Sequence, residues 1–335
     1  MKSKQKKLAP ASPPTVLLVE KIHPQFLALL ESKARIVRPD PQDRNAFSED
    51  ALAQLAGAEH VDAIIIRTKG CVTGKIIRAS PRLKVIGRHG IGLDHIDLKA
   101  ARRAGVAVVY TPAGSRIAVA EHTWGMILAL AKNSCGSDRA VRAGDYEFRE
   151  RRKSFQLFGK TLGVIGLGRI GATMAQMAVN GFGMKVLYTD IIKRPDIERS
   201  VGAKKVPLRR LLERSDVVTI HTPLDDSTRG LIGARELAWM QPHALLINCA
   251  RGAIVDTVAV AKALKAGKLG GAGIDVFCPE VPQRNHPLLA ATERSILSPH
   301  SAAQTLEANL GYAEVVFDVF RVLEGKKPHW PALYE

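Results

Sequence analysis

The sequence predicts an α/β protein with two doubly wound domains, each a parallel sheet covered by helices on both faces. Short runs of Val, Ile and Leu alternate with longer segments of helical spacing along most of the chain, and this order produces parallel sheets. The runs are continuously apolar, as expected for strands that are buried on both faces. The 335 residues also exceed what one hydrophobic core usually serves, so two domains are expected.

The expected elements form two series along the chain. In the first, the strands are 16–19, 63–66, 83–86 and 106–109, and the helices are 24–34, 73–79, 97–104 and 116–132. In the second, the strands are 162–165, 185–188, 216–220, 244–248 and 273–276. Helical spacing returns over 302–323, where the residues expected on one side are Leu306, Leu310, Val316, Phe317 and Phe320.

We place the domain junctions near residues 110 and 300. One domain then comprises 15–110 and 301–335, and the other comprises 111–300. Residues 1–14 are rich in Lys, Pro and Ser. They carry too little apolar surface to offset the entropy of ordering, so we expect a disordered basic tail. We expect no further domain after residue 335.

Composition excludes several classes of protein. No apolar run reaches the roughly 18 residues that a membrane span needs. The formal net charge of +17 attracts anions in general, but aromatic residues make up only 5% and do not interleave with the basic clusters, so we do not expect a nucleic-acid partner. The four cysteines show no metal-binding spacing and are expected to be reduced thiols of a cytoplasmic protein, with no metal site.

A glycine motif predicts a Rossmann cofactor domain. Gly166, Gly168 and Gly171 follow the apolar strand 162–165 and open a helical pattern, which is the context that makes G-x-G-x-x-G specific. The first glycine permits a tight turn, the second lets backbone approach a pyrophosphate, and the third lets the helix pack closely on the strand. The helix N-terminus then favours the anion.

An acidic residue indicates which dinucleotide is bound. Asp190 ends the next expected strand, at the distance where a carboxylate meets the ribose hydroxyls of the adenosine. A carboxylate there repels a 2′-phosphate, so NAD is favoured over NADP. The nearby cations Lys193 and Arg194 can weaken that preference.

Three segments after the glycine loop carry a family resemblance: 248–252 (Asn-Cys-Ala-Arg-Gly), 273–280 (Gly-Ile-Asp-Val-Phe-Cys-Pro-Glu) and 298–302 (Ser-Pro-His-Ser-Ala). In this order and spacing the chain resembles the D-isomer-specific 2-hydroxyacid dehydrogenases. Segments 83–94, 119–123 and 215–224 support the resemblance, which covers about residues 60 to 325. It implies an NAD-dependent oxidoreductase in which a flavodoxin-like substrate domain accompanies the Rossmann domain.

The residue types suit the reduction of a 2-oxo acid. His300 can give a proton to the carbonyl oxygen, because imidazole titrates near neutral pH. Glu280 can hydrogen-bond the other ring nitrogen and stabilise the imidazolium. Arg251 offers a planar fork that matches a carboxylate. In the family that the chain resembles, these three positions are catalytic.

The resemblance also implies contacts around the cofactor. It places Asp275 at the nicotinamide carboxamide, Thr222 and Cys249 in the cofactor cleft, and Arg169 and Ile170 beside the pyrophosphate. Ser115 departs from the family, which often has Asn in this segment. The resemblance further suggests a homodimer built through the nucleotide domains, with contacts from residues 116–150.

The resemblance implies a 2-hydroxy or 2-oxo acid as substrate, and several acids of this class are candidates. Glu280, rather than Gln, argues against formate dehydrogenases. Arg67 and Thr68 follow an expected strand and resemble the substrate loop of phosphoglycerate dehydrogenases, while Gly90 and Gly92 can offer backbone N–H groups to the carboxylate. We therefore expect a phosphoglycerate-dehydrogenase-like enzyme, with a hydroxypyruvate or glyoxylate reductase as the alternative. An NAD(H)-sensing corepressor, which shares this fold, is the alternative of another class.

Overall fold

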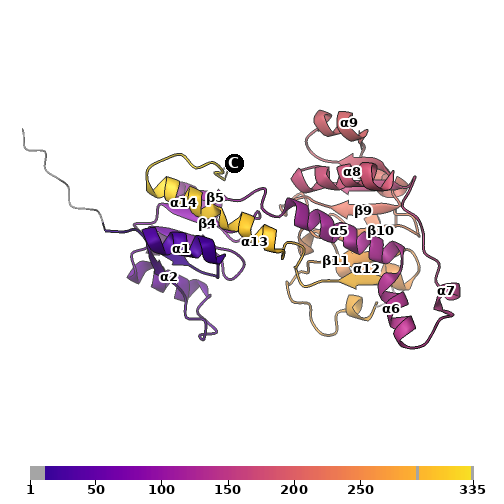
Figure 1. The fold of residues 1–335 in the computed structure, drawn as a ribbon, viewed down its shortest axis with the longest axis horizontal. Helices are drawn as coiled ribbons and strands as arrows, with labels where there is room; N and C mark the ends of the chain where they lie inside the picture. Colours follow the sequence, from indigo (N-terminus) through magenta and orange to yellow (C-terminus); the bar gives the residue numbers. More distant parts are fainter. Residues whose placement is uncertain (1–11, 292–293, 333–335) are drawn as a thin grey trace, which may run out of the picture. The chain divides into compact units, whose positions relative to one another are not determined.

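The structure is a computed structural model that describes residues 12–291 and 294–332. The chain forms two compact units: one runs to Ser115 and resumes at Leu306, and the other comprises Arg116–Thr305 (Figure 1). Each contains one sheet whose strands are all parallel, so the predicted class of two doubly wound sheets is confirmed. The expected basic tail lies outside the described residues except for 12–14, which belong to no helix or strand.

The first unit has five strands in the order β2-β1-β3-β4-β5. They are β1 (Thr15–Leu18), β2 (Arg35–Val37), β3 (Ala63–Ile66), β4 (Val85–Arg88) and β5 (Ala107–Tyr110). This is the flavodoxin-like order, as expected for the substrate domain. Four of the strands lie within two residues of their predicted positions, whereas the short β2 was not predicted.

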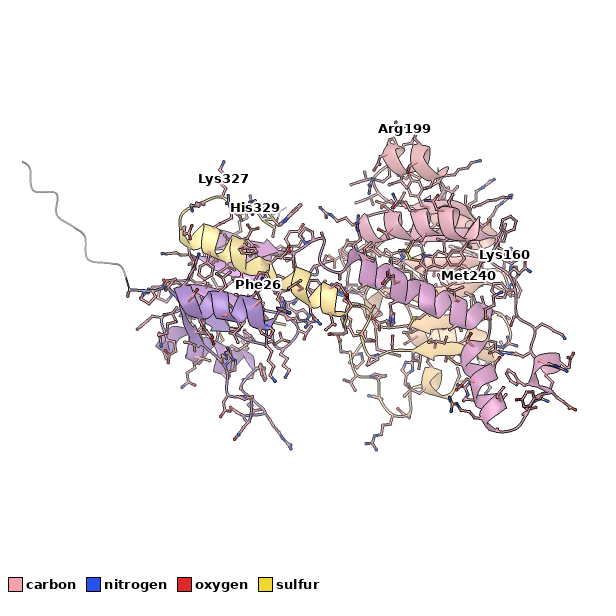
Figure 2. The ribbon with its side chains drawn as sticks, in the orientation of Figure 1. Phe26, Lys160, Arg199, Met240, Lys327 and His329 are labelled. Atoms are coloured by element: carbon pink, nitrogen blue, oxygen red, sulfur yellow. The ribbon has the colours of Figure 1, made fainter. Side chains whose placement is uncertain are left out.

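Helices cover both faces of this sheet. They are α1 (Pro24–Lys33), α2 (Glu49–Ala58), α3 (Gly74–Ala79), α4 (Leu98–Arg103), α13 (Leu306–Ala313) and α14 (Val315–Leu323). Side chains of α1 and α14 share one core with Val16 and Leu18 of β1, while α2, α3 and α4 share the other core with Leu17. Phe26 of α1 (Figure 2) contacts Phe317 of α14 edge to face, with 5.4 Å between the ring centroids.

The expected single helix over 302–323 is wrong in two respects. The segment forms two helices, α13 and α14, that meet at Glu314. Its apolar residues do not share one side, since Leu306 is 84% exposed and Phe317 51% exposed while Val316 is buried. The buried face of α14 instead contains Val315, Val316, Val319 and Phe320.

The second unit has seven strands in the order β12-β11-β10-β9-β6-β7-β8. They are β6 (Thr161–Ile165), β7 (Lys185–Thr189), β8 (Lys204–Lys205), β9 (Val217–Ile220), β10 (Leu245–Asn248), β11 (Gly271–Ile274) and β12 (Ser295–Leu297). Read from β8 to β11, this is the Rossmann order 3-2-1-4-5-6 with β12 as a further strand. The order reverses between β6 and β9, which is where such sheets bind dinucleotides.

Helices again cover both faces. They are α5 (Arg116–Ala131), α6 (Ser134–Arg142), α7 (Phe148–Arg151), α8 (Arg169–Phe182), α9 (Pro195–Val201), α10 (Leu208–Arg214), α11 (Ala234–Leu237) and α12 (Thr257–Lys265), with short 3-10 turns η1 (Gly252–Ile254) and η2 (Pro287–Ala290). Helices α5 and α8 lie side by side on one face (Figure 1), and α10, α11 and α12 pack on the other. Arg199 of α9 points away from the body of the unit (Figure 2). Within the described ranges, no helix is long and apolar enough to cross a membrane.

Candidate active site

The glycine loop joins β6 to α8, as the motif predicted. Gly166 has φ +89°, and a Cβ on it would meet the backbone of His221 at 2.8 Å. A Cβ on Gly171 would lie 2.1 Å from the carbonyl oxygen of Gly166, so helix and strand pack too closely for a side chain. Gly168 caps the helix, and the space beside it is open to 4 Å.

These features suit a bound dinucleotide. Helix α8 has 14 residues and directs the free N–H groups of its first turn toward the loop, which attracts phosphate. Arg169 is exposed and Ile170 half-buried at this end. The hydroxyl oxygen of Thr222 is buried and has no hydrogen-bond partner among the described residues. The unpaired buried hydroxyl of Thr222 and the open space beside Gly168 fit a polar group that approaches this loop.

Asp190, which directly follows β7, is hydrogen-bonded to the glycine loop. Its Oδ2 accepts the N–H of Leu167 at 2.7 Å, and its Oδ1 accepts the N–H of Ile192 at 3.0 Å. The carboxylate is therefore fixed beside the middle residue of the loop, in the position where the sequence expected a contact with the adenosine ribose.

Carboxylates hold the two cations that follow Asp190. Arg194 donates from Nε and Nη2 to Asp196, at 3.1 and 2.8 Å, and from Nη1 to the carbonyl of Leu167 at 2.6 Å. Lys193 lies 3.7 Å from a carboxylate oxygen of Glu198. Both cations thus have negative partners, which limits their ability to attract a 2′-phosphate.

The predicted catalytic residues all follow strands at the same edge of the second sheet. Arg251 comes after β10, Glu280 after β11 and His300 after β12. These three strands are parallel neighbours, with Asn248 paired to Ile274 and Ile274 to Leu297. The carboxyl ends of neighbouring parallel strands lie at one edge of the sheet, so the fold brings the three segments to that edge.

His300 and Glu280 form a direct pair. Nδ1 of His300 lies 2.5 Å from Oε1 of Glu280, and the two side chains are 38% and 65% exposed. The His300 backbone N–H donates to the carbonyl of Asp275 at 2.8 Å. With Nδ1 engaged, Nε2 is the ring nitrogen left for proton exchange with a substrate.

Asp275 organises the segment that carries His300. Its carboxylate accepts the N–H of Ser301 at 2.8 Å and that of Ala302 at 3.1 Å, and it also bonds the hydroxyl of Ser298. The side chain is fully buried. The structure therefore gives this carboxylate a positioning function besides the carboxamide contact that the resemblance implied.

Arg251 directly precedes the turn η1, as its N-cap residue. Its Nη1 donates to the carbonyl of Ala250 at 2.7 Å, and its own carbonyl accepts from the side-chain amide of Asn248 at 3.0 Å. The Asn248 amide oxygen in turn accepts the N–H of Ala250 at 3.0 Å. The end of β10 is therefore cross-linked by side-chain bonds that hold the Arg251 backbone.

Cys249 lies near His122 and Asp275, and their potential ligand atoms are within 4.8 Å of one another. Burial raises the pKa of the Cys249 thiol to about 12, so the thiolate that a metal would need is disfavoured. His122 Nε2 lies 3.0 Å from the Ser298 hydroxyl. We interpret His122, Cys249 and Asp275 as neighbouring side chains that hydrogen bonds, such as the one between His122 and Ser298, hold in place.

The expected substrate residues Arg67 and Thr68 follow β3 in the first unit. Their backbone N–H groups donate to Oε2 of Glu20, at 2.8 and 2.5 Å, and the Thr68 hydroxyl donates to Oε1 at 2.8 Å. The Arg67 guanidinium lies 5.7 Å from the centre of the Tyr312 ring. This is a cation–π contact.

The other expected substrate loop follows β4. The N–H of Gly90 donates to the carbonyl of Arg88 at 2.8 Å, so it is already used within the loop. The Gly92 carbonyl accepts from Nε of Arg88, whose side chain is buried. The loop is braced by Arg88, a role that the sequence did not suggest.

Three residues near these segments were missed by sequence reasoning. Glu20 is separated from Arg67 by 47 residues along the chain. Tyr312 and His89 lie edge to face with centroids 5.9 Å apart, although they come from opposite ends of the first unit's sequence. The only signal was the position of Glu20 directly after the predicted strand 16–19, because α/β proteins place functional side chains at strand ends.

Comparison with known proteins agrees with the geometry. Residues 124–302 match the family defined as D-isomer specific 2-hydroxyacid dehydrogenase, NAD binding domain. The chain is 36% identical to a D-3-phosphoglycerate dehydrogenase of Methanocaldococcus jannaschii over 93% of this chain and 58% of that protein. It is 37% identical to a glyoxylate reductase of Korarchaeum cryptofilum over 76% of this chain and 77% of that one.

This chain belongs to the D-isomer specific 2-hydroxyacid dehydrogenase family. The chain is similar to the solved structure of the Aquifex aeolicus D-lactate dehydrogenase in complex with NAD and lactic acid, with a TM-score of 0.82 and 30% identity over 93% of this chain and 96% of that one. The family's NAD-binding domain falls on the second unit, with its glycine loop and Asp190. The predicted family, NAD as cofactor and the oxidoreductase class are thus confirmed. The chain spans little more than half the length of the M. jannaschii relative.

Proposed function

We propose that this 2-hydroxyacid dehydrogenase interconverts a D-2-hydroxy acid and its 2-oxo acid, with Arg251, Glu280 and His300 as its catalytic residues. The observation that carries the proposal is the 2.5 Å contact between His300 Nδ1 and Glu280 Oε1 at the sheet edge that also carries Arg251. A carboxylate on one ring nitrogen leaves the other as the proton donor or acceptor. The same unit contains the glycine loop, which suits NAD.

His300 moves the proton. In the reductive direction the imidazolium releases the Nε2 proton to the carbonyl oxygen of the 2-oxo acid, and in the oxidative direction neutral Nε2 takes it from the hydroxyl. Glu280 stabilises the charged ring through Nδ1–H and fixes its orientation. Bound NAD(H) supplies the hydride chemistry.

Arg251 binds and orients the substrate carboxylate. Its guanidinium presents parallel N–H donors to the two carboxylate oxygens, and the positive charge also polarises the adjacent carbonyl. Orientation matters because the correct alignment of reacting atoms lowers the entropic part of the barrier.

For the substrate, we propose a 2-hydroxy acid with a second anionic group, as in 3-phosphoglycerate. Burial and the positive charge of Arg67, with a smaller contribution from Arg88, lower the pKa of His89 to about 4, while the negative charge of Glu20 acts to raise it. Two arginine charges therefore act on one buried position beside this loop. Lys69 follows, with its ammonium 4.8 Å from the centre of the Phe47 ring. This concentration of positive charge supports an anionic distal group, and relatives named D-3-phosphoglycerate dehydrogenase agree.

The second candidate is a hydroxypyruvate or glyoxylate reductase. It is favoured by Glu20, whose carboxylate already accepts the backbone N–H groups of Arg67 and Thr68. These donors are therefore unavailable to a phosphate, and the nearby negative charge opposes a second anion. Relatives named glyoxylate reductase also support this candidate.

Replacement of Arg67 separates the two candidates. If Arg67 binds a distal phosphate, Arg67→Ala lowers kcat/KM for phosphohydroxypyruvate by roughly tenfold to a hundredfold, the value of one charged hydrogen bond, and changes glyoxylate reduction little. Arg103→Ala removes an equal charge from an exposed position at the end of α4 and serves as the control. Equal losses on both substrates, or a wild type that prefers glyoxylate, would support the second candidate.

We further propose that the enzyme is a homodimer in the cytoplasm. An apolar hollow of about 660 Å³ lies between α5 and α8, lined in part by Trp124, Leu128, Met177 and Phe182, and such hollows suit protein contacts. Residues 116–150 are the proposed contact segment. Sedimentation of the purified protein tests the dimer.

The four cysteines are free, which suits the reducing cytoplasm.

A further inference from the structure

Glu20 lies just beyond the carboxyl end of β1 in the first unit. Strand β1 pairs in parallel with β3, with Leu18 opposite Ile65. Glu20 follows β1 by two residues and the Arg67 loop follows β3 directly. Parallel pairing therefore brings the carboxylate against the loop at the same edge of the sheet.

The loop 67–69 binds this carboxylate as a nest binds an anion. Oε2 accepts the N–H groups of Arg67 and Thr68, at 2.8 and 2.5 Å, and Oε1 accepts the Thr68 hydroxyl at 2.8 Å. Partial burial raises the pKa of Glu20, but the backbone N–H of Lys69, the Thr68 hydroxyl and the other two N–H groups together hold the pKa below its ordinary value. The side chain is thus ionised at neutral pH and fixes three consecutive residues of backbone.

The Arg67 side chain is supported at its other end. Its guanidinium lies 5.7 Å from the centre of the Tyr312 ring, and Tyr312 on α13 is only 6% exposed. A buried ring in a packed helix limits the directions that the guanidinium can take. Glu20 fixes the start of the side chain and Tyr312 its end.

We propose that Glu20 is a positioning residue for substrate recognition, which holds the Arg67 loop so that the guanidinium meets the distal group of the substrate. The inference rests on the proposed role of Arg67 in substrate binding. It goes beyond that role because Glu20 makes no substrate contact and acts through the loop. A contact that is the same in the ground state and in the transition state affects KM rather than kcat.

The variant Glu20→Gln keeps the size of the side chain and removes its charge. The amide oxygen can still accept the N–H groups of Arg67 and Thr68, but the negative charge is lost and the amide nitrogen cannot accept the proton of the Thr68 hydroxyl. We expect the KM for phosphohydroxypyruvate to rise about tenfold, as for the loss of one charged hydrogen bond. The kcat and the KM for glyoxylate, which has no distal group, should stay close to wild type.

The matched control is Glu59→Gln. Glu59 is a carboxylate of the same unit, 2.6 Å from Arg35 at the end of α2, so the variant removes the same charge away from the loop. Its kinetics should equal those of wild type. Melting temperatures of both variants show whether the unit stays folded. If Glu20→Gln unfolds, Glu20→Asp retains the charge with a shorter reach, and an intermediate rise in KM is expected.

A double-mutant cycle with Arg67→Ala decides whether Glu20 acts through Arg67. If it does, Glu20→Gln adds almost nothing to the KM for phosphohydroxypyruvate once Arg67 is absent. Additive effects in the double variant would overturn the positioning role. A lower KM in Glu20→Gln would also overturn it, because Glu20 would then act as an anion that competes with the substrate.

The single variants separate this inference from the proposed substrate site. An unchanged KM in Glu20→Gln, together with a raised KM in Arg67→Ala, would overturn the role of Glu20 and support that of Arg67. No effect of Arg67→Ala on any substrate would overturn both.

Discussion

His300 has a left-handed backbone, with φ +53°, which few residues other than glycine adopt. The bonds around Asp275 explain how it is held there. The Asp275 carbonyl accepts the N–H of His300 at 2.8 Å, and the Asp275 carboxylate accepts the next two N–H groups. The ring is thereby turned toward Glu280. Such conformations persist where the surroundings over-determine them, often at functional sites.

The first prediction concerns proton transfer. His300→Asn should lower kcat by about 10²-fold or more, since a general acid contributes at least that much, while the dissociation constant for NADH stays near wild type. His243→Asn is the matched control, because His243 pairs with Asp216 at 2.8 Å elsewhere in the same unit. Steady-state kinetics and NADH fluorescence titration provide the two readouts. Wild-type turnover in His300→Asn would remove His300 from the mechanism.

His89 leads to a prediction on stability and pH. Its pKa is lowered to about 4, first by burial and then by the charges of Arg67 and Arg88, whereas the unfolded chain has a value near ~6.5. Between these pH values the unfolded state binds a proton that the folded state does not, so the free energy of unfolding falls as the pH falls from about 6.5 to 4. The titration of His89 should lower this free energy by about 3 kcal/mol.

The variant His89→Phe tests this account, because the ring shape is kept and the titration is removed. Urea unfolding of wild type and variant should show a free energy that falls less steeply in the variant between pH 6.5 and 4. The benzyl ring also avoids burying the unpaired Nε2 of His89. Parallel pH profiles in the two proteins would show that His89 is not the titrating group.

At the scale of elements, side chains that follow β7 hold the glycine loop that precedes α8. Asp190 accepts the Leu167 N–H at 2.7 Å while Arg194 donates to the Leu167 carbonyl at 2.6 Å. The middle residue of the glycine loop is thus held from both sides. If Asp190 also binds the adenosine ribose, as the sequence predicts, one carboxylate determines both cofactor choice and loop geometry.

We predict that Asp190→Ala narrows the preference for NAD over NADP. Loss of a charged hydrogen bond should weaken NADH binding by roughly tenfold or more, while NADPH loses a repulsive partner. The variant should not become specific for NADP, because Arg194 is still held by Asp196. Dissociation constants for both dinucleotides are the measurement, with Glu213→Ala, at an exposed ion pair on α10, as control. Equal use of both cofactors by the wild type would contradict the assignment.

Most of the elements could be predicted because their apolar runs are strong. Strand β3 lies at its predicted residues, and the glycine loop joins its strand and helix as expected. The missed elements lack that signal. Strand β8 consists of two exposed lysines at a sheet edge, β2 has three residues with one buried, and α6 buries only Gly136 and Ala140.

Site residues could be predicted where they directly follow a predicted strand. They could not be predicted where their position depends on which strands pair or on which side chains form ion pairs. Arg251 and Glu280 follow predicted strands, so topology alone places their segments at one edge, whereas the short β12 that precedes His300 was not predicted. Glu20 could not be assigned to the Arg67 loop, because only the parallel pairing of β1 and β3 joins residues so distant in sequence. The partners of Lys193 and Arg194 were missed for a different reason, since ion pairs depend on side-chain directions.

At the scale of the whole molecule, charge and chemistry point to the same kind of ligand. The formal net charge of +17 raises encounter rates for dinucleotides and carboxylic acids alike. It does not select among them. In the function proposed above, Arg251 binds the carboxylate that all 2-oxo acids share, and Arg67 binds the group in which they differ.

The most direct test of the central claim is a turnover panel on the wild-type protein. Initial rates of NADH oxidation are measured with phosphohydroxypyruvate, hydroxypyruvate and glyoxylate, and repeated with NADPH. We predict turnover of at least one acid with NADH, a lower kcat/KM with NADPH, and loss of the activity in His300→Asn. Tight NADH binding without turnover of any 2-oxo acid would contradict the account and favour a protein that senses NAD(H) instead.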